Sequence, residues 1–117
     1  MGIRRSEELV ESEFRVDADG NPTGGYTTLV TDADERVMSI DWQDGIVGDS
    51  GQNGAFVEDV IEAARQRIQF FNSNPKFRCR ENSLAITKLE EALQWLDWRT
   101  RQRLLQGIEN TYATHDG

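Results

Sequence analysis

The sequence has 117 residues, of which 37% are hydrophobic and 29% charged, and its formal net charge is -8 at pH 7. This length predicts a single domain, and a short, polar chain often gains stability by forming oligomers. The acidic balance argues against a binder of nucleic acid polymers or membrane surfaces, since both need broad positive potential.

One cysteine, Cys79, and one histidine, His115, are present. They exclude a disulfide within the chain and a zinc site built from cysteine and histidine. No apolar run approaches the ~20 residues that span a membrane. These observations favour a protein of a reducing, cytosolic compartment.

Residues 1–25 are polar and end in the turn-rich sequence DADGNPTGG, which predicts a flexible or loosely held lead-in. The runs YTTLVTD (26–32) and RVMSIDW (36–42) are rich in β-branched and aromatic residues and favour strands. The DADE segment predicts a hairpin connection between them, and Asp44-Gly45 a second tight hairpin turn. We therefore predict an antiparallel β-meander over 26–48, followed by a loop over 49–54.

From Ala55 the hydrophobic residues recur at helical spacing. Pro75 disfavours helix in the residue before it, so the first helix ends near NSNP. A second helix is predicted from about Asn82 to Leu105, stopping at Gly107. The predicted fold is α+β, a single domain with a small N-terminal antiparallel β-sheet and a C-terminal two-helix hairpin over 55–106.

The second helix is apolar on two sides. At ~100° per residue, most aliphatic residues gather on one face, whereas Trp95 and Trp98 lie on roughly the opposite side. A helix apolar on two sides is buried on two sides. Either a second chain covers the tryptophans, which predicts an oligomer, or they pack on the sheet of their own chain.

Three arginines follow these tryptophans. Arg99 and Arg103 are four residues apart and therefore neighbours at the margin of the main apolar face, whereas Arg101 points away. Guanidinium groups present forked donors to phosphate oxygens, so the pair could bind a small anion. The alternative is helix-end chemistry, since cations are favoured at a helix C-terminus.

Asn82 projects toward the middle of the apolar face. It is either the N-cap of the second helix or a ligand contact. Arg99 lies 17 positions further on, about 25 Å along a helix at ~1.5 Å per residue. One small ligand can therefore reach both residues only if two copies of the helix run antiparallel, which would create two pockets per two-fold dimer.

The motifs CREN, LEEAL, WL and RT stand in this order within CRENSLAITKLEEALQWLDWRTRQR (79–103), after QNG and VEDVI. Over roughly residues 36–112 the chain resembles the hairpin domain shared by two phage anti-defence families. One is the Thoeris anti-defence sponge, and the other is the anti-CBASS cyclic-nucleotide sponge. The preceding strand segment SIDWQDG favours the Thoeris type.

The resemblance implies a protein without catalytic residues, metal or cofactor that sequesters an immune signalling nucleotide in the cytoplasm of an infected bacterial host. The implied ligand is a cyclic ADP-ribose isomer, and some members also hold cyclic di- or trinucleotides in separate pockets. By motif, the ligand contacts would be Asn82, Arg99, Arg103 and Phe71, with Phe70 as the alternative to Phe71. The implied assembly is a homo-oligomer with pockets between subunits, either a dimer or a hexamer built as a trimer of dimers.

One motif departs from the family pattern. The second helix of the family usually ends in RGVEGT, whereas this sequence has QGIENT (106–111), which lacks one cation and one glycine. Two other functions remain as alternatives: a nucleotide-hydrolysing enzyme, and a structural or partner-binding oligomer without a ligand. The acidic residues are scattered rather than clustered, which argues against the metal-dependent hydrolase.

Overall fold

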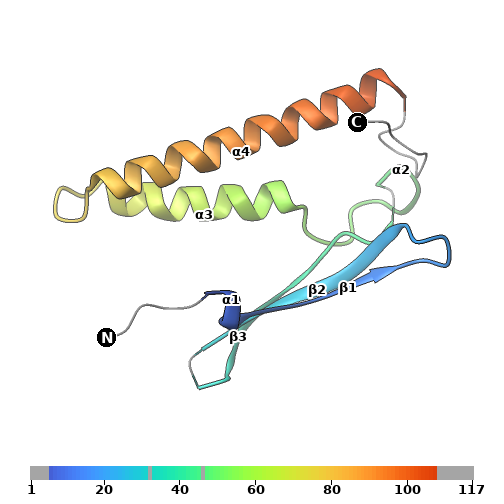
Figure 1. The fold of residues 1–117 in the computed structure, drawn as a ribbon, viewed down its shortest axis with the longest axis horizontal. Helices are drawn as coiled ribbons and strands as arrows, with labels where there is room; N and C mark the ends of the chain where they lie inside the picture. The colour runs from blue at the N-terminus through green and yellow to red at the C-terminus, as the bar shows by residue number, and fades with distance from the viewer. Residues whose placement is uncertain (1–5, 32, 46, 108–117) are drawn as a thin grey trace. The chain divides into compact units, whose positions relative to one another are not determined.

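The computed structural model describes residues 6–31, 33–45 and 47–107. The chain divides into two compact units, one ending at Ala55 and one beginning at Phe56. The first contains a three-stranded antiparallel sheet and the second a pair of long helices (Figure 1). The α+β prediction is confirmed, and the prediction that the two units form one domain stays a prediction.

The sheet is a simple meander in the order β1-β2-β3. The elements of this unit are α1 (Ser6–Leu9), β1 (Val10–Val16), β2 (Pro22–Val30), β3 (Arg36–Asp41) and α2 (Val47–Ser50). The register pairs Val10 with Leu29 and Thr27 with Ile40. Asp34, in the connection between β2 and β3, adopts a positive φ of 63°, which agrees with the predicted DADE hairpin.

The first strand lies where a loosely held lead-in was predicted. In VESEFRV the apolar residues Val10, Phe14 and Val16 stand at even-numbered positions and the charged residues at odd ones, and this period of two is a strand signal. The following turn is held by Asp17, whose carboxylate accepts hydrogen bonds from the backbone N–H of Asp19 (2.9 Å) and of Asn21 (3.0 Å). The stretch 10–25 is therefore a hairpin arm of the sheet, and the rest of the predicted lead-in, residues 1–5, lies outside the described residues.

The predicted hairpin turn at Asp44-Gly45 is wrong, because no strand returns after it in the described part of 43–56. Side chains hold a closed loop instead. Asn53 accepts from the Asp44 N–H and donates to the Asp44 carbonyl, both at 2.8 Å. Gly54 passes so close to Trp42 that an added Cβ would lie 2.6 Å from its backbone carbonyl. The loop therefore depends on glycine here, because no larger residue fits.

The centre of the sheet is Thr27, which is buried but has its hydroxyl satisfied. This hydroxyl accepts a hydrogen bond from the Trp42 indole N–H at 2.8 Å and shares another with the Ser12 hydroxyl at 2.8 Å. A buried hydroxyl without such partners would destabilise the sheet. The network thus fixes Trp42, the first residue after β3, over the middle strand.

The second unit is an antiparallel pair of helices, α3 (Val57–Asn72) and α4 (Arg80–Leu105). Helix α4 begins earlier than predicted, because Cys79 is its N-cap: the Cys79 sulfur accepts from the Asn82 N–H at 3.4 Å. The alternative of Asn82 as N-cap is therefore wrong. Gly107, with φ of 71°, follows the C-cap Gln106, so the predicted stop is confirmed.

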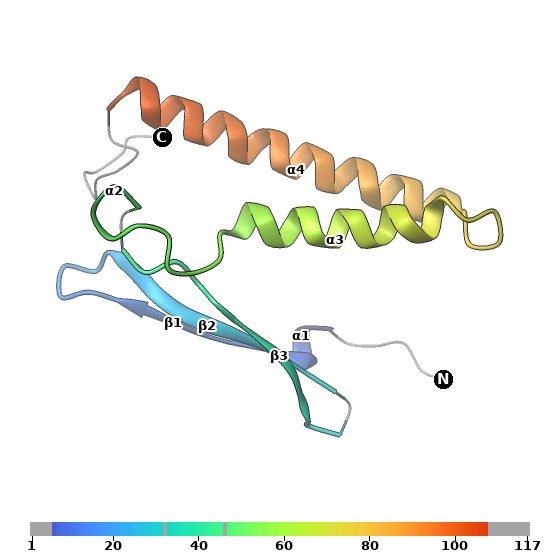
Figure 2. The same ribbon diagram turned by 180° about the vertical axis from the view of Figure 1, so that it is seen from behind.

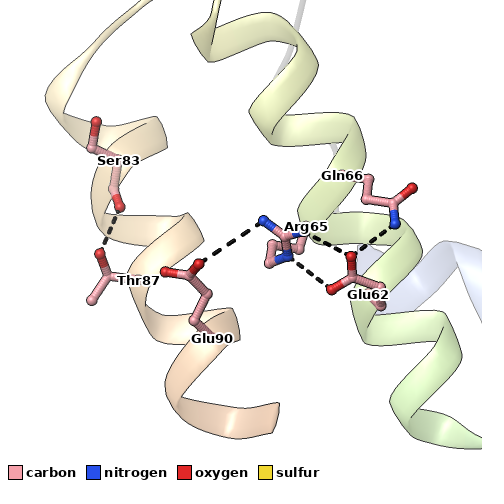
Figure 3. Close-up of polar contacts among 6 residues, drawn as sticks. All are labelled: Glu62, Arg65, Gln66, Ser83, Thr87 and Glu90. Carbon is pink, nitrogen blue, oxygen red and sulfur yellow. Dashed lines mark hydrogen bonds and ion pairs between the residues drawn. The ribbon is translucent and has the colours of Figure 1, made fainter. Parts of the chain in front are cut away.

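Ile86 is the buried residue of α4. A network of ion pairs and hydrogen bonds also links the two helices (Figure 3). Arg65 makes two hydrogen bonds to the Glu62 carboxylate, at 2.8 and 2.7 Å, and lies 3.9 Å from a carboxylate oxygen of Glu90 on α4. Gln66 donates a further hydrogen bond to Glu62 at 2.8 Å. These donors stabilise the carboxylate, Arg65 most strongly, and lower the pKa of Glu62 from its ordinary 4.5 to about 2.

Helix α4 is much longer than its partner. It has 26 residues against 16 in α3, or about 39 Å against about 24 Å at ~1.5 Å per residue. Both views of the ribbon show the free end of α4 extending beyond the start of α3 (Figures 1 and 2). The predicted second apolar face is solvent-exposed, with Trp95 72% and Trp98 56% accessible.

The depressed pKa of Glu62 gives a pH-dependent stability. Because the folded-state value lies below the unfolded one, the carboxylate contributes its full stabilisation above pH about 4.5 and loses it as the pH falls toward about 2. We expect Glu62→Gln to lower the melting temperature at neutral pH, with the difference from the parent shrinking through this window. Thermal unfolding followed by circular dichroism between pH 2 and pH 7 measures it.

Glu91→Gln is the control, because among the described residues its carboxylate pairs only with the exposed Lys88, at 3.5 Å, and such pairs contribute little. A Glu62→Gln difference that stays constant across the window would contradict the assignment.

Candidate functional site

The four predicted contact residues fall into two groups within the helical unit. Phe71 and Asn82 lie beside the loop that joins α3 and α4, which we call the hairpin end. Arg99 lies beside the first turn of α3, and Arg103 follows one helical turn later. The structure therefore brings the residues together in pairs but does not bring the two pairs together in one chain.

The hairpin end is built from phenylalanine rings. Phe71 meets Phe70 and Phe77 edge to face, with ring centroids 5.7 Å apart in each case. The three rings line an open hollow of about 430 Å³ together with Ser73, Asn74 and Pro75. Phe71 is the central ring of the three, and Phe70, the alternative from sequence, lines the same hollow.

Asn82 connects α4 to this hollow. Its side-chain N–H donates to the Phe77 carbonyl at 3.2 Å, and its backbone N–H is taken by the Cys79 cap. Within the described part of the chain, its side-chain oxygen has no hydrogen-bond partner. The side-chain nitrogen therefore holds the amide in place, and the side-chain oxygen offers an acceptor.

Asn72, which the sequence analysis missed, holds the hairpin end closed. Its side chain accepts from the Cys79 N–H and donates to the Ser83 hydroxyl, both at 3.1 Å. Its backbone carbonyl accepts from Arg78 at 3.1 Å. The last residue of α3 thus fixes the first turn of α4, and with it Asn82. An asparagine at a helix end is too common to identify this role without the structure.

A second missed residue is Arg67. Its guanidinium carbon lies 4.7 Å from the centroid of the Phe71 ring and 5.5 Å from that of Phe70. These distances are typical of a cation–π contact. The available signal was the spacing, because a residue four positions before Phe71 on a helix lies on the same face.

The arginine group is only loosely held. Arg99 lies 3.6 Å from a Glu58 carboxylate oxygen, and its Nε is buried without a hydrogen-bond partner. Arg103 makes no ion pair with any described residue. Arg101, in contrast, is 69% exposed and lies 2.9 Å from the Asp97 carboxylate one turn earlier. The sequence-based separation of Arg101 from the other two arginines therefore has a structural counterpart.

The side chains of the two groups have the chemistry that binding needs. Phenyl rings can stack on a base, an amide oxygen can accept a hydrogen bond, and two guanidinium groups can donate to an anion. Within 6–31, 33–45 and 47–107, no cluster of three or more His, Cys, Asp or Glu side chains could hold a metal ion. No helix among those described is long and apolar enough to cross a bilayer.

Comparisons with known proteins identify the family of this chain. The family model described as Acb2/Tad1, hairpin domain, matches residues 34–101 and so includes Phe71, Asn82 and Arg99. A protein named Thoeris anti-defense 1, from Bacillus phage SBSphiJ7, is 39% identical over 104 residues, which are 89% of this chain and 70% of that protein. The helices α3 and α4 are thus the hairpin of that domain, and the chain belongs to the Thoeris anti-defence family that carries it.

Proposed function

We propose that the protein is a non-enzymatic sponge that binds and sequesters a cyclic ADP-ribose isomer, and so blocks a Thoeris defence inside an infected bacterium. The name of its relative, Thoeris anti-defense 1, supports the anti-defence role. The observation that carries the proposal is the division of the binding groups into two pairs at different ends of one long helix. This division suits a ligand pocket formed between two chains.

Geometry explains why two chains are needed. Asn82 and Arg99 are 17 positions apart on the unbroken helix α4, about 25 Å at ~1.5 Å per residue. When two copies of α4 run antiparallel, Asn82 of one copy comes beside Arg99 of the other. The operation is two-fold, so the same pocket forms twice in each dimer.

The exposed face of α4 supports such an assembly. Trp95 and Trp98 lie on α4 itself, and Leu105, seven residues after Trp98, extends the same apolar face onto the overhanging end of the helix. Large aromatic side chains exposed together on one helix are typical of an interface. A dimer would cover them, and a hexamer built as a trimer of dimers is the larger assembly that we propose for this family member.

Each group has a distinct role in the pocket. Arg99 and Arg103 are one turn apart and present forked donors that match the oxygens of a diphosphate. Phe71 or its neighbour Phe70 offers a ring face against which a base can stack. The Asn82 amide oxygen accepts from a hydroxyl or amino group of the ligand. Cyclic di- or trinucleotides, which share the phosphate and base chemistry, are the second ligand class.

The first prediction concerns assembly. The exposed tryptophan face implies at least a dimer in solution, with a hexamer as the larger expected species. Light scattering coupled to size exclusion at micromolar concentration measures the mass. A mass of 13.3 kDa, that of one chain, would contradict both the assembly and the shared pocket.

The second prediction concerns the arginines. Arg99→Ala or Arg103→Ala should each weaken binding of a cyclic ADP-ribose isomer roughly ten- to hundredfold, because each removes a charge-assisted hydrogen bond. Arg101→Ala is the matched control and should change affinity little, since its guanidinium is exposed and paired with Asp97. Isothermal titration calorimetry measures affinity, and melting temperatures establish that each variant folds.

Equal losses at all three arginines would indicate general electrostatic attraction. An unchanged affinity for Arg99→Ala and Arg103→Ala would assign both residues to helix-end chemistry.

The third prediction separates a sponge from a nucleotide hydrolase. After prolonged incubation and denaturation, the bound nucleotide should be recovered intact, because the binding groups include no nucleophile held beside a base. Chromatography of the released ligand measures this. Product that increases with protein concentration would favour the enzyme, and ligand that never associates would favour a structural oligomer.

A further inference from the structure

The hairpin end carries a positive charge that the chain as a whole lacks. Between Arg67 and Arg80 the sequence contains four cations and no carboxylate, although the net charge of the protein is -8. The same stretch contains the three rings of the hollow. Cations interleaved with aromatic rings are typical of surfaces that bind the phosphates and bases of nucleotides.

Arg67 differs from the other cations of this stretch. Its guanidinium lies over two rings, 4.7 Å from the Phe71 centroid and 5.5 Å from that of Phe70. It makes no ion pair with a carboxylate among the residues that the structure describes. In contrast, Arg65, two residues earlier on the same helix, is fully engaged by Glu62 and Glu90.

We propose that Arg67 is a third ligand-binding arginine, which grips the phosphates of the bound nucleotide from the hairpin end. The inference rests on the proposed function and deepens it. Each pocket then contains Arg67 from one chain and Arg99 with Arg103 from the other. The ligand class that fits has at least two negative charges, enough to engage cations from both chains.

Contacts in the structure connect Arg67 to the proposed members of the site. Asn82 donates to the Phe77 carbonyl, the Phe77 ring meets the Phe71 ring, and the Phe71 ring lies under Arg67. A guanidinium that rests on a ring has one face covered, while its N–H edge stays free to donate to phosphate oxygens. The rings hold the cation in one orientation and so reduce the conformational entropy that it loses on binding.

The structure also allows a simpler role in which Arg67 only supports Phe71, and a pair of substitutions separates the two. Arg67→Lys keeps a cation over the ring but loses the planar fork of donors. Arg67→Gln removes both the cation over the ring and the planar fork of donors. Lys76→Gln is the matched control, because it removes one charge from the same hairpin end without disturbing the ring contacts.

Calorimetric titration of the assembled protein with a cyclic ADP-ribose isomer should show a loss of about tenfold or more for Arg67→Gln. Arg67→Lys should lose severalfold, and Lys76→Gln should change affinity less than twofold. Melting temperatures of all variants should stay close to that of the parent. The Arg67→Gln loss should also persist when the salt concentration is raised, because a direct contact is screened less than a distant charge.

Parent affinity in Arg67→Lys together with a loss in Arg67→Gln would assign Arg67 to ring support alone and overturn the proposal. Equal losses of affinity in Arg67→Gln and Lys76→Gln would indicate general electrostatic attraction at the hairpin end rather than a direct contact of Arg67. No loss of affinity in Arg67→Gln would also overturn the proposal. In all of these outcomes the parent protein still binds, so the proposed function survives. A parent that binds no nucleotide would instead remove the proposed function and, with it, this inference.

Discussion

The length of the unbroken helix α4 is the constraint on which the site depends. A helix rises only ~1.5 Å per residue, so the 26 residues of α4 hold Asn82 and Arg103 rigidly apart. No kinking proline interrupts the helix, and no loop within it could bring the two residues together. A small ligand that uses both must therefore lie between chains, and this requirement joins binding to assembly.

Because α3 is shorter than α4, it leaves the C-terminal end of α4 uncovered. Helix α3 covers α4 only as far as the Glu58–Arg99 pair, which joins the first turn of α3 to α4. Beyond this level α4 continues past the start of α3 (Figures 1 and 2). Arg103 and Leu105 belong to its last turn. A longer α3 would have covered these positions and made them part of the core of one chain.

Strong periodic patterns in the sequence predicted most of the fold, and local side-chain chemistry explains what was missed. The two helices, the strands around 26–42 and the stop at Gly107 follow from apolar spacing and glycine. β1 was missed because its polar residues and the adjacent turn sequence hid the alternation. The start of α4 was misplaced because Cys79, an uncommon cap, takes the role that asparagine usually fills. Asn72 depends on contacts across the hairpin, which no local pattern contains. Arg67 instead contacts rings on its own helix, at a spacing that the sequence shows but that was not used.

At the end of α4, the proposed ligand contact Arg103 is also a helix-end cation. Gln106 stands at the C-cap, and the residues from 108 onward lie outside the described structure. Arg103 is therefore the basic residue of the last turn, where a cation stabilises the helix dipole. The two roles are compatible, because the helix dipole interacts with the charge of Arg103, whereas the proposed ligand contact uses the N–H groups of its guanidinium. In the proposed complex, a bound diphosphate would engage a cation that already stabilises the end of the helix.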